Sequence, residues 1–364
     1  MKQNAAVTRL LLAGDVMLGR ALDQALEHPG DPRLREPLIE DARDYLLLAE
    51  RRSGELGLPL GPAEPWGELL PLIDAEAPDH WIINLETSIG SSGDFCPYKS
   101  IHYRMSSANL AVLSAGRVDC CCLANNHVMD FGEAGLLETL SRLEQQQLAY
   151  CGAGRTRKAA RAPLMLAGHR ALRLINLCFV DSGVPPHWEA RADSCGVFLL
   201  QSPDRQAADQ LLRTLDGPRE CPTVVSLHWG GNWGYRITEA QRSFAHALLD
   251  SPAVDLVVGH SSHHPKEIEL YRGKAAIYGA GDLINDYEGI RGHAQYRPEL
   301  ALVYIVELER GALRRLEAVP FCRRRLRLEQ TDREAVEFLR QVLSGQTTED
   351  AFQISANGRL QAVL

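Results

Sequence analysis

Short apolar runs alternate with amphipathic segments along most of the chain, and many of the runs stop at a polar motif. Strand-like composition predicts strands at Val7–Ala13, Trp81–Leu85, Asp119–Leu123, Leu172–Phe179, Thr223–Leu227, Asp255–Val258, Ala275–Tyr278 and Leu300–Leu308. Helical spacing of apolar residues predicts helices at Gly135–Gln147, Asp204–Leu215, Glu239–Leu249 and Arg333–Leu343. Short strands interleaved with amphipathic helices predict an α/β fold built in layers.

One stretch departs from this alternation. Residues 27–67 are rich in Pro and Gly and contain a helical piece at Glu36–Arg52. We interpret them as an excursion inserted between the first two strands, which could be a lid or a partner surface. Residues 1–320 are expected to form one domain around this excursion, and residues 321–364 a C-terminal helix with a loosely held tail.

Five polar motifs stand where predicted strands end. They are Gly14-Asp15, Asn84-Leu85-Glu86, Asn125-Asn126-His127, His228-Trp229-Gly230 and the run Gly259–His264, which holds three histidines. The carboxyl edge of a sheet is where α/β proteins build their sites. Taken singly, each motif has a plainer interpretation: Asp15 could cap a helix, Glu86 could be a solvated strand end, and His228 a structural histidine. Asp130 could likewise cap a helix that begins near Glu133.

Taken together, the motifs favour a metal site. Asp and Glu oxygens with several imidazoles suit two divalent cations roughly 3.5–4 Å apart, with one carboxylate bridging them. Mixed nitrogen and oxygen ligands favour Mn, Fe, Zn or Ni over Ca, which prefers oxygen alone. A hydroxide bridging the metals would be the nucleophile, and a further histidine on the rim could protonate the leaving group.

The composition is that of a globular protein without a nucleic-acid surface. The 364 residues are 45% hydrophobic and 24% charged, and the formal net charge is -8. The one short basic run, Arg323–Arg325, is interpreted as a solvated strand face. We find no secretory signal and no apolar stretch near the ~18 residues of a membrane span, so we expect a cytoplasmic protein without a membrane anchor. The oligomeric state stays open.

The nine cysteines show no metal-binding spacing. Three of them, Cys120–Cys122, are adjacent within an apolar run. Neighbouring strand residues point to opposite faces, so these three cannot all ligate one metal. We interpret them as small core residues of a buried strand in a reducing compartment.

Six pieces of the chain, in this order, carry a family resemblance: Leu12–Arg20, Asn84–Thr87, Leu123–Gly132, Gly152–Gly154, Ser226–Gly230 and Gly259–His263. The chain resembles the capsule-synthesis CapA family, also called poly-γ-glutamate biosynthesis proteins, within the calcineurin-like metallophosphoesterase superfamily. The resemblance implies a four-layer α-β-β-α sandwich of the metallo-dependent phosphatase type. It also implies roles for seven residues: Asp15 and His263 on one metal, Asn126, His228 and His260 on the other, Glu86 as the bridge, and His127 as the general acid.

The chain departs from the superfamily pattern at two places. Met17 stands where the wider superfamily has a histidine, so the first metal has a thinner set of ligands, which His264 or another residue could complete. The segment Tyr278–Asp286 replaces the more usual Ser-Leu-Gly-Asn-Phe pattern. Within it, Asp282 could orient a ligand histidine or be a turn residue.

Basic and aromatic residues near these motifs suggest an anionic substrate, either a small molecule or a polymer. The predicted contacts are Arg20, Lys99 and Arg104, with His102 and Tyr103 on the same loop, and a rim of Trp229, Trp233, Tyr235 and Arg236 beside His228. The aromatic residues could equally fill the core of their loop.

Three functions fit these observations. The first is a hydrolase with two metal ions that cleaves a phosphoester or an amide-type bond. The second is a non-catalytic or accessory protein of poly-γ-glutamate or capsule-type polymer synthesis. Retention of His127 favours catalysis, whereas the missing histidine at Met17 favours the accessory role. A mononuclear metalloprotein, with Asn126, His228, His260 and Glu86, is the third.

Overall fold

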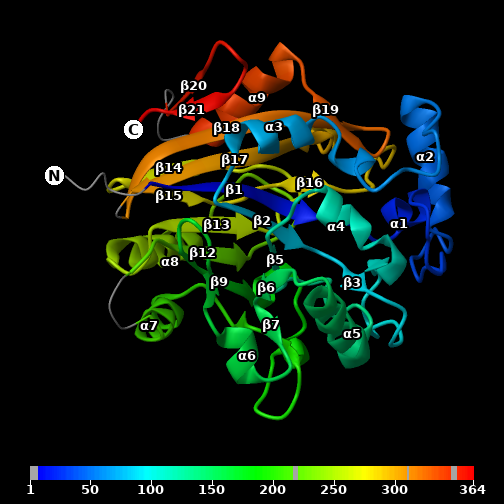
Figure 1. Cartoon of the computed structure of the whole chain (residues 1–364), viewed down its shortest axis with the longest axis horizontal. Helices are drawn as coiled ribbons and strands as arrows, with labels where there is room; N and C mark the ends of the chain where they lie inside the picture. The colour runs from blue at the N-terminus through cyan, green and yellow to red at the C-terminus, as the bar shows by residue number, and fades with distance from the viewer. Residues whose placement is uncertain (1–6, 216–219, 310, 346–350) are drawn as a thin grey trace.

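The computed structural model describes residues 7–215, 220–309, 311–345 and 351–364, which form a mixed α/β structure with two large sheets (Figure 1). The ten-stranded sheet has the order β20 (Phe352–Ile354), β21 (Leu360–Ala362), β18 (Ala312–Arg324), β17 (Leu300–Glu309), β1 (Val7–Val16), β2 (His80–Leu85), β5 (Cys120–Cys122) and β6 (Ala149–Cys151), with β16 (Asp282–Ile284) on β1 and β19 (Arg327–Gln330) on β18. The seven-stranded sheet has the order β11 (Leu199–Leu200), β9 (Leu172–Phe179), β12 (Thr223–His228), β13 (Leu256–His260), β15 (Lys274–Ile277) and β14 (Ile268–Tyr271), with β8 (Leu164–Leu166) on β9. Two short pairs join β3 (Ser88–Ile89) to β4 (Arg104–Met105) and β7 (Ala153–Gly154) to β10 (Gly196–Val197).

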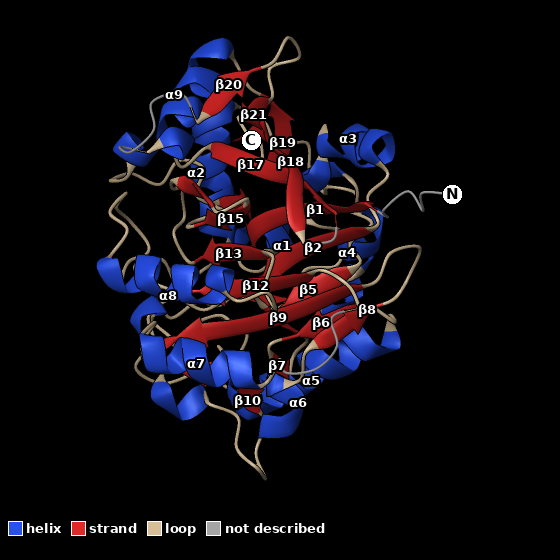
Figure 2. Cartoon of the chain, turned by 90° about the vertical axis from the view of Figure 1, so that its left-hand side faces the viewer, coloured by secondary structure: helices blue, strands red, loops and turns tan. Residues whose placement is uncertain are grey.

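Helices surround the strands, which fill the middle of the molecule in Figure 2. In the described part of the chain they are α1 (Ala21–Ala25), α2 (Arg43–Ser53), α3 (Leu69–Glu76), α4 (Ala111–Ala115), α5 (Gly132–Gln145), α6 (Arg157–Arg161), α7 (Arg205–Arg213), α8 (Glu239–Asp250) and α9 (Arg333–Ser344). Side chains fix where several of them begin. Thr238 and Gln241 form a capping box at α8, and the carboxylate of Asp204 accepts a backbone N–H at the start of α7.

Alternation along the strands sends side chains into different apolar clusters. On β1, Leu10 and Leu12 join a cluster that also contains Val224 and Val258 of the other large sheet. The intervening Leu11 joins a second cluster, with apolar residues of α1 to α5. A third cluster joins the other face of the seven-stranded sheet to α7 and α8. The two large sheets therefore share one apolar cluster, and each has helices against its other face.

Parallel pairing brings the ends of the central strands together. Strand β1 runs parallel to β2 and to β16, and Asp15 stands opposite both Asn84 and Asp282. In the other sheet β12 runs parallel to β13, and His228 stands opposite His260. The polar motifs at these strand ends therefore meet at one edge of the two sheets.

Close backbone packing explains Gly14, which precedes Asp15. A Cβ at Gly14 would lie 1.8 Å from the carbonyl oxygen of Gly281, too close for any side chain. The same carbonyl accepts the backbone N–H of Asp15 at 3.2 Å. Gly14 thus allows the segment leading into β16 to approach β1 and fixes the backbone of Asp15.

Most of the predicted elements are confirmed, with small differences at their ends. All eight predicted strands and all four predicted helices are present. The helix predicted at Glu36–Arg52 begins only at Arg43. Pro37 disfavours a helical conformation at Glu36, and the following residues turn back so that Asp41 forms a bridge with Arg33. The cysteine run is the buried strand β5, as predicted.

Two predictions for the C-terminal part differ from the structure. The expected loose tail contains β20 and β21 in its described residues, 351–364, and β21 pairs with β18. Arg323 is buried instead of solvated, and its guanidinium donates to the carbonyl oxygens of Asp282 and Leu300. The alternating pattern of β18 gave no indication that a charged side chain points inward.

None of the helices that the structure describes has both the length and the apolar character needed to cross a membrane.

Candidate metal centre

Asp15 is the central residue of the polar cluster at the strand ends. It is fully buried at the end of β1. The amide of Asn84 donates to Asp15 Oδ1 at 2.7 Å, and the backbone N–H of Ser261 donates to Oδ2 at 3.3 Å. These neutral donors hold the carboxylate in place but supply no compensating charge.

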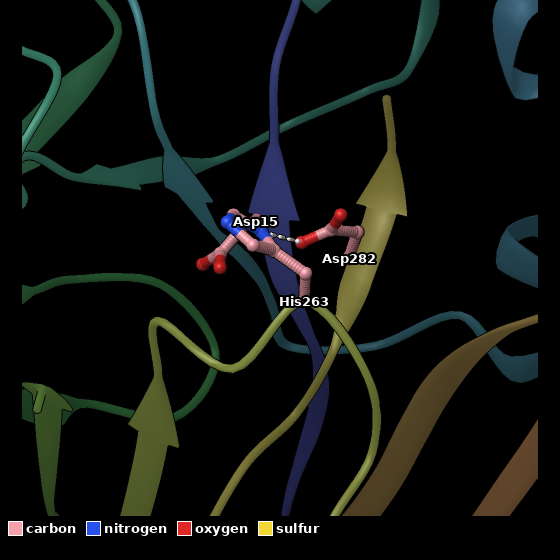
Figure 3. Close-up of side chains that lie close together, drawn as sticks. All are labelled: Asp15, His263 and Asp282. Atoms are coloured by element: carbon pink, nitrogen blue, oxygen red, sulfur yellow. Dashed lines mark hydrogen bonds and ion pairs between the residues drawn. The ribbon is translucent and has the colours of Figure 1, made fainter. Parts of the chain in front are cut away.

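Two groups of potential ligands share Asp15. In the first, Asp15, His263 and Asp282 offer ligand atoms within 4.8 Å of one another (Figure 3). In the second, Asp15, Glu86 and His228 do the same. The geometry therefore makes Asp15 a second candidate for the bridging position, beside the predicted Glu86.

Asn126 and His260, which were predicted to share a metal with His228, lie beside the second group. Asn126 Oδ1 lies 3.1 Å from His228 Nε2, and His260 Nδ1 lies 3.7 Å from Asp15 Oδ1. The other ring nitrogen of His260 lies 2.9 Å from Ser226 Oγ, which orients the imidazole.

Both ring nitrogens of His263 have a partner. Its Nδ1 lies 3.0 Å from Asp282 Oδ1, the orienting contact predicted for Asp282, and its Nε2 lies 3.4 Å from the hydroxyl of Tyr287. His264, by contrast, turns away from this cluster, because its Nε2 accepts the backbone N–H of Gly234 at 3.1 Å. Met17 is buried, and its sulfur accepts the hydroxyl of Tyr287 at 3.9 Å.

The residues present fit divalent metal ions. Glu86 Oε1, His228 Nδ1 and His260 Nδ1 are buried atoms without a hydrogen-bond partner among the described residues. Buried polar atoms are nearly always paired, so three unpaired atoms in one cluster need a cause. A carboxylate oxygen and two imidazole nitrogens are a donor set suited to Mn, Fe or Zn.

Electrostatics support the same conclusion. Burial, reinforced by Asp282, raises the pKa of Asp15 to about 7. Burial and the charges of Asp15 and Asp282 also raise the pKa of Glu86 well above its ordinary range. Burial lowers the pKa of His228 well below its ordinary value and that of His260 to about 3, so both imidazoles are neutral, as ligands must be.

His127 stands beside this cluster in a network of its own. Its Nδ1 lies 2.6 Å from Asp130 Oδ2, and its Nε2 lies 3.8 Å from Glu86 Oε1. Lys99 forms an ion pair with Asp130, and the backbone N–H of Tyr103 donates to the same carboxylate at 2.7 Å. Burial lowers the pKa of His127 to about 4, so the free protein holds a neutral imidazole near pH 7.

The predicted substrate contacts lie in different surroundings. Arg20 is buried and paired with Asp286 at 2.5 Å and Glu36 at 3.0 Å. Lys99 lies in the His127 network, and Arg104 is partly buried with its guanidinium 3.8 Å from the centre of the Phe131 ring.

The aromatic residues predicted for the rim divide into two groups. Trp229 belongs to the hydrophobic core, which is the alternative that the sequence left open. Trp233 stacks on His293 with ring centres 3.8 Å apart, 5.4 Å from the ring of His263, and Tyr235 is 40% exposed. Trp233 therefore reaches the predicted ligand His263, whereas the ring of Tyr235 lies 4.6 Å from that of His264, which turns away from the cluster.

Several supporting residues were missed by the sequence reasoning. Asn84 bridges Asp15 and Glu86, since its amide also donates to Glu86 Oε2 at 3.2 Å. Asn125 accepts the backbone N–H groups of His127 and Val128 and so shapes the loop that carries Asn126. Both residues stand inside the quoted motifs, which was the available signal. Asp286 ends the quoted segment Tyr278–Asp286, whereas Tyr287 lies just outside it and gave no such signal.

We predict that His228→Ala lowers the amount of metal bound per chain. The substitution removes one imidazole from the group that also contains Asp15 and Glu86. Elemental analysis after reconstitution with Mn, Fe or Zn measures the effect. His246→Ala is the matched control, because His246 lies on α8 and pairs with Glu269 away from the cluster. Equal metal content in both variants would contradict the assignment of His228.

Metal affinity should also depend on pH around neutrality. Asp15 has a raised pKa of about 7 in the metal-free protein and must lose its proton to bind a cation. Protonation therefore competes with the metal below pH 7, and affinity should fall about tenfold between pH 8 and pH 6 from this one group. Calorimetric titration with Mn²⁺ in buffers at both pH values measures the change, and an affinity that rises at pH 6 would contradict it.

Comparisons with known proteins agree with the sequence motifs. The family model described as "Bacterial capsule synthesis protein PGA_cap" matches residues 9–287. A probable polyglutamine synthesis accessory protein of Mycobacterium tuberculosis H37Rv is 42% identical over 350 residues, covering 94% of this chain and 92% of that protein. The PGA biosynthesis protein CapA of Bacillus subtilis is 27% identical and covers 61% of this chain and 55% of that protein.

Similarity to solved structures is weaker. The crystal structure of TT1561 of Thermus thermophilus covers 84% of this chain and 100% of its own, with 10% identity and a TM-score of 0.39, which supports no conclusion here. The family match spans most of the chain, and the mycobacterial relative matches over almost its whole length. The chain therefore belongs to the bacterial capsule synthesis family that includes CapA.

Proposed function

We propose that this CapA-family protein is a metal-dependent hydrolase that cleaves a phosphoester or an amide-type bond. One observation carries the proposal: unpaired ligand atoms of Glu86, His228 and His260 lie beside a histidine that is already oriented by a carboxylate. Metal ligands alone would serve a binding protein. An oriented His127 beside them is what proton transfer requires.

The residues of the chain divide the chemistry among themselves. Divalent metals held by Asp15, Glu86, His228 and His263 would activate water and polarise the oxygen of the bond to be cleaved. Asp130 holds Nδ1 of His127, which leaves Nε2 directed toward Glu86 and free to move a proton. An anionic substrate raises the proton affinity of the imidazole, so His127 becomes charged only when substrate is present.

The predicted four-layer sandwich is part of this proposal. The cluster shared by the two large sheets and the separate helix clusters on their outer faces support it. In that arrangement the strand ends of both sheets supply the ligands together. The predicted superfamily relationship would place the same kind of metal centre at this edge.

The relatives suggest the setting in which the reaction occurs. They are described as a polyglutamine synthesis accessory protein and a PGA biosynthesis protein. We therefore place this chain in the synthesis of a poly-γ-glutamate or capsule-type polymer, with an anionic substrate. A non-catalytic accessory role is the second candidate, favoured by Met17, whose buried thioether occupies the place of a superfamily ligand.

We predict that His127→Ala leaves the metal content unchanged and lowers turnover by about 10²–10⁴-fold. The loss should be smaller for p-nitrophenyl esters, because p-nitrophenolate leaves without a proton, than for alkyl phosphoesters or γ-glutamyl amides. Steady-state kinetics on both kinds of substrate, with elemental analysis of the same preparations, measures the effect.

Companion variants separate this role from others. Asp130→Asn should lower kcat without loss of metal, because it disturbs the orientation of the imidazole and the ion pair of Lys99 but no metal ligand. His246→Ala should behave as the unmodified protein. Loss of metal from His127→Ala would make His127 a ligand, and no turnover by the unmodified, metal-loaded protein on any of these substrates would favour the accessory role.

A further inference from the structure

A large groove lies beside the metal centre, outside the ligand cluster. Its volume is about 1460 Å³. One wall is the excursion, from Glu36 to Ser53, and the other walls come from residues 285–299 and 322–326. Sites for small ligands have volumes of ~300–1000 Å³, so this groove has room for an extended ligand.

Two side chains connect the groove to the metal centre. Tyr287 lines the groove, and its hydroxyl lies 3.4 Å from His263 Nε2. Asn285 also lines the groove, and its amide donates to Asp282 Oδ2 at 2.7 Å. One layer of side chains therefore separates the groove from the candidate ligands His263 and Asp282.

The groove is positive although the chain carries a net charge of -8. Six arginines and three glutamates line it. Four of the arginines are exposed and have no ion pair in the described part of the chain: Arg51, Arg52, Arg291 and Arg324.

The three glutamates are already engaged by groups of the protein. Glu36 pairs with Arg20 and accepts the hydroxyl of Tyr45. Glu288 accepts the hydroxyl of Ser53 and the backbone N–H of Leu326, and Glu299 pairs with Arg297. Among the described residues the four exposed arginines therefore form no ion pair, and guanidinium groups of this kind bind carboxylates and phosphates in a bidentate manner.

Apolar side chains stand among the arginines. Leu38 is 96% exposed and Ile290 is 36% exposed, and both line the groove together with Ile39 and Leu48. A chain of carboxylates separated by methylene groups would meet both kinds of side chain. A polyphosphate has no apolar part to place against these residues, so the groove favours a polycarboxylate.

We propose that this groove binds an extended polycarboxylate chain and leads it to the metal centre, with the excursion as a wall of the binding site. What happens to the bound chain at the metal centre rests on the proposed function. The binding of the chain rests on the groove alone. Arg51 and Arg52 come from the excursion, whereas Arg291 and Arg324 come from the opposite side. Ligand carboxylates are therefore held from both walls.

The test measures binding of fluorescently labelled poly-γ-glutamate of defined length by anisotropy, using the full chain. The fourfold variant replaces the groove arginines: Arg51→Gln, Arg52→Gln, Arg291→Gln and Arg324→Gln. The matched control removes the same charge from exposed arginines outside the groove: Arg170→Gln, Arg191→Gln, Arg213→Gln and Arg333→Gln. The expected result is at least a tenfold loss of affinity in the groove variant, little change in the control, and weaker binding as salt increases.

Three results would overturn the proposal. The first is that the unmodified protein does not bind the polymer at low salt. The second is that the two fourfold variants lose affinity for the polymer equally. The third is that polyphosphate binds more tightly than the polycarboxylate. The assay measures binding without turnover. A protein that binds the polymer through the four arginines but hydrolyses nothing would refute the proposed hydrolase and leave the groove assignment intact.

Discussion

Three carboxylates, those of Asp15, Glu86 and Asp282, are fully buried in one cluster where the strands end. Taking each charge out of water costs several kcal/mol, and neighbours of the same sign add to that cost. Within the described residues, no Lys or Arg forms an ion pair with any of the three. The imidazoles of His228 and His260 are neutral. Burial opposes a charge on His263, but Asp282 and Asp15 raise the pKa of His263, so this one imidazole can offset part of the negative charge. Divalent cations would compensate the remainder.

The rest of the architecture serves to hold this cluster together. Parallel pairing places Asp15 between Asn84 and Asp282, and the other sheet delivers His228 and His260 from adjacent strands. Gly14 permits the close approach that brings the Asp282 strand to β1. The groove extends from this centre toward the solvent, and the buried pair of Arg20 with Glu36 and Asp286 ties the excursion to the chain just after the first motif.

Sequence patterns predicted the central strands and helices because period-two and helical spacing follow directly from burial of one face. Four of the five residues in the two ligand groups, namely Asp15, Glu86, His228 and His263, stand in motifs at or just after strand ends, which is why the sequence drew attention to them. Asp282, which begins β16, was expected only as an orienting or turn residue. Sequence patterns could not predict which residues support the ligands. Asp130, taken for a helix cap, holds His127 instead, and Tyr287 contacts His263 from 24 positions away. Such contacts depend on tertiary packing. The inward direction of Arg323 depends on it too, since Arg324, the next residue of the same strand, is exposed.

The central claim is that this buried cluster holds two divalent metal ions around Asp15. Anomalous diffraction from crystals grown with Mn²⁺ or Zn²⁺, measured at the absorption edge of the metal, tests it most directly. We expect two peaks roughly 3.5–4 Å apart, one beside Glu86 and His228 and the other beside His263 and Asp282, with Asp15 contacting both. An empty cluster in metal-saturated crystals, or metal bound only elsewhere on the chain, would contradict the account.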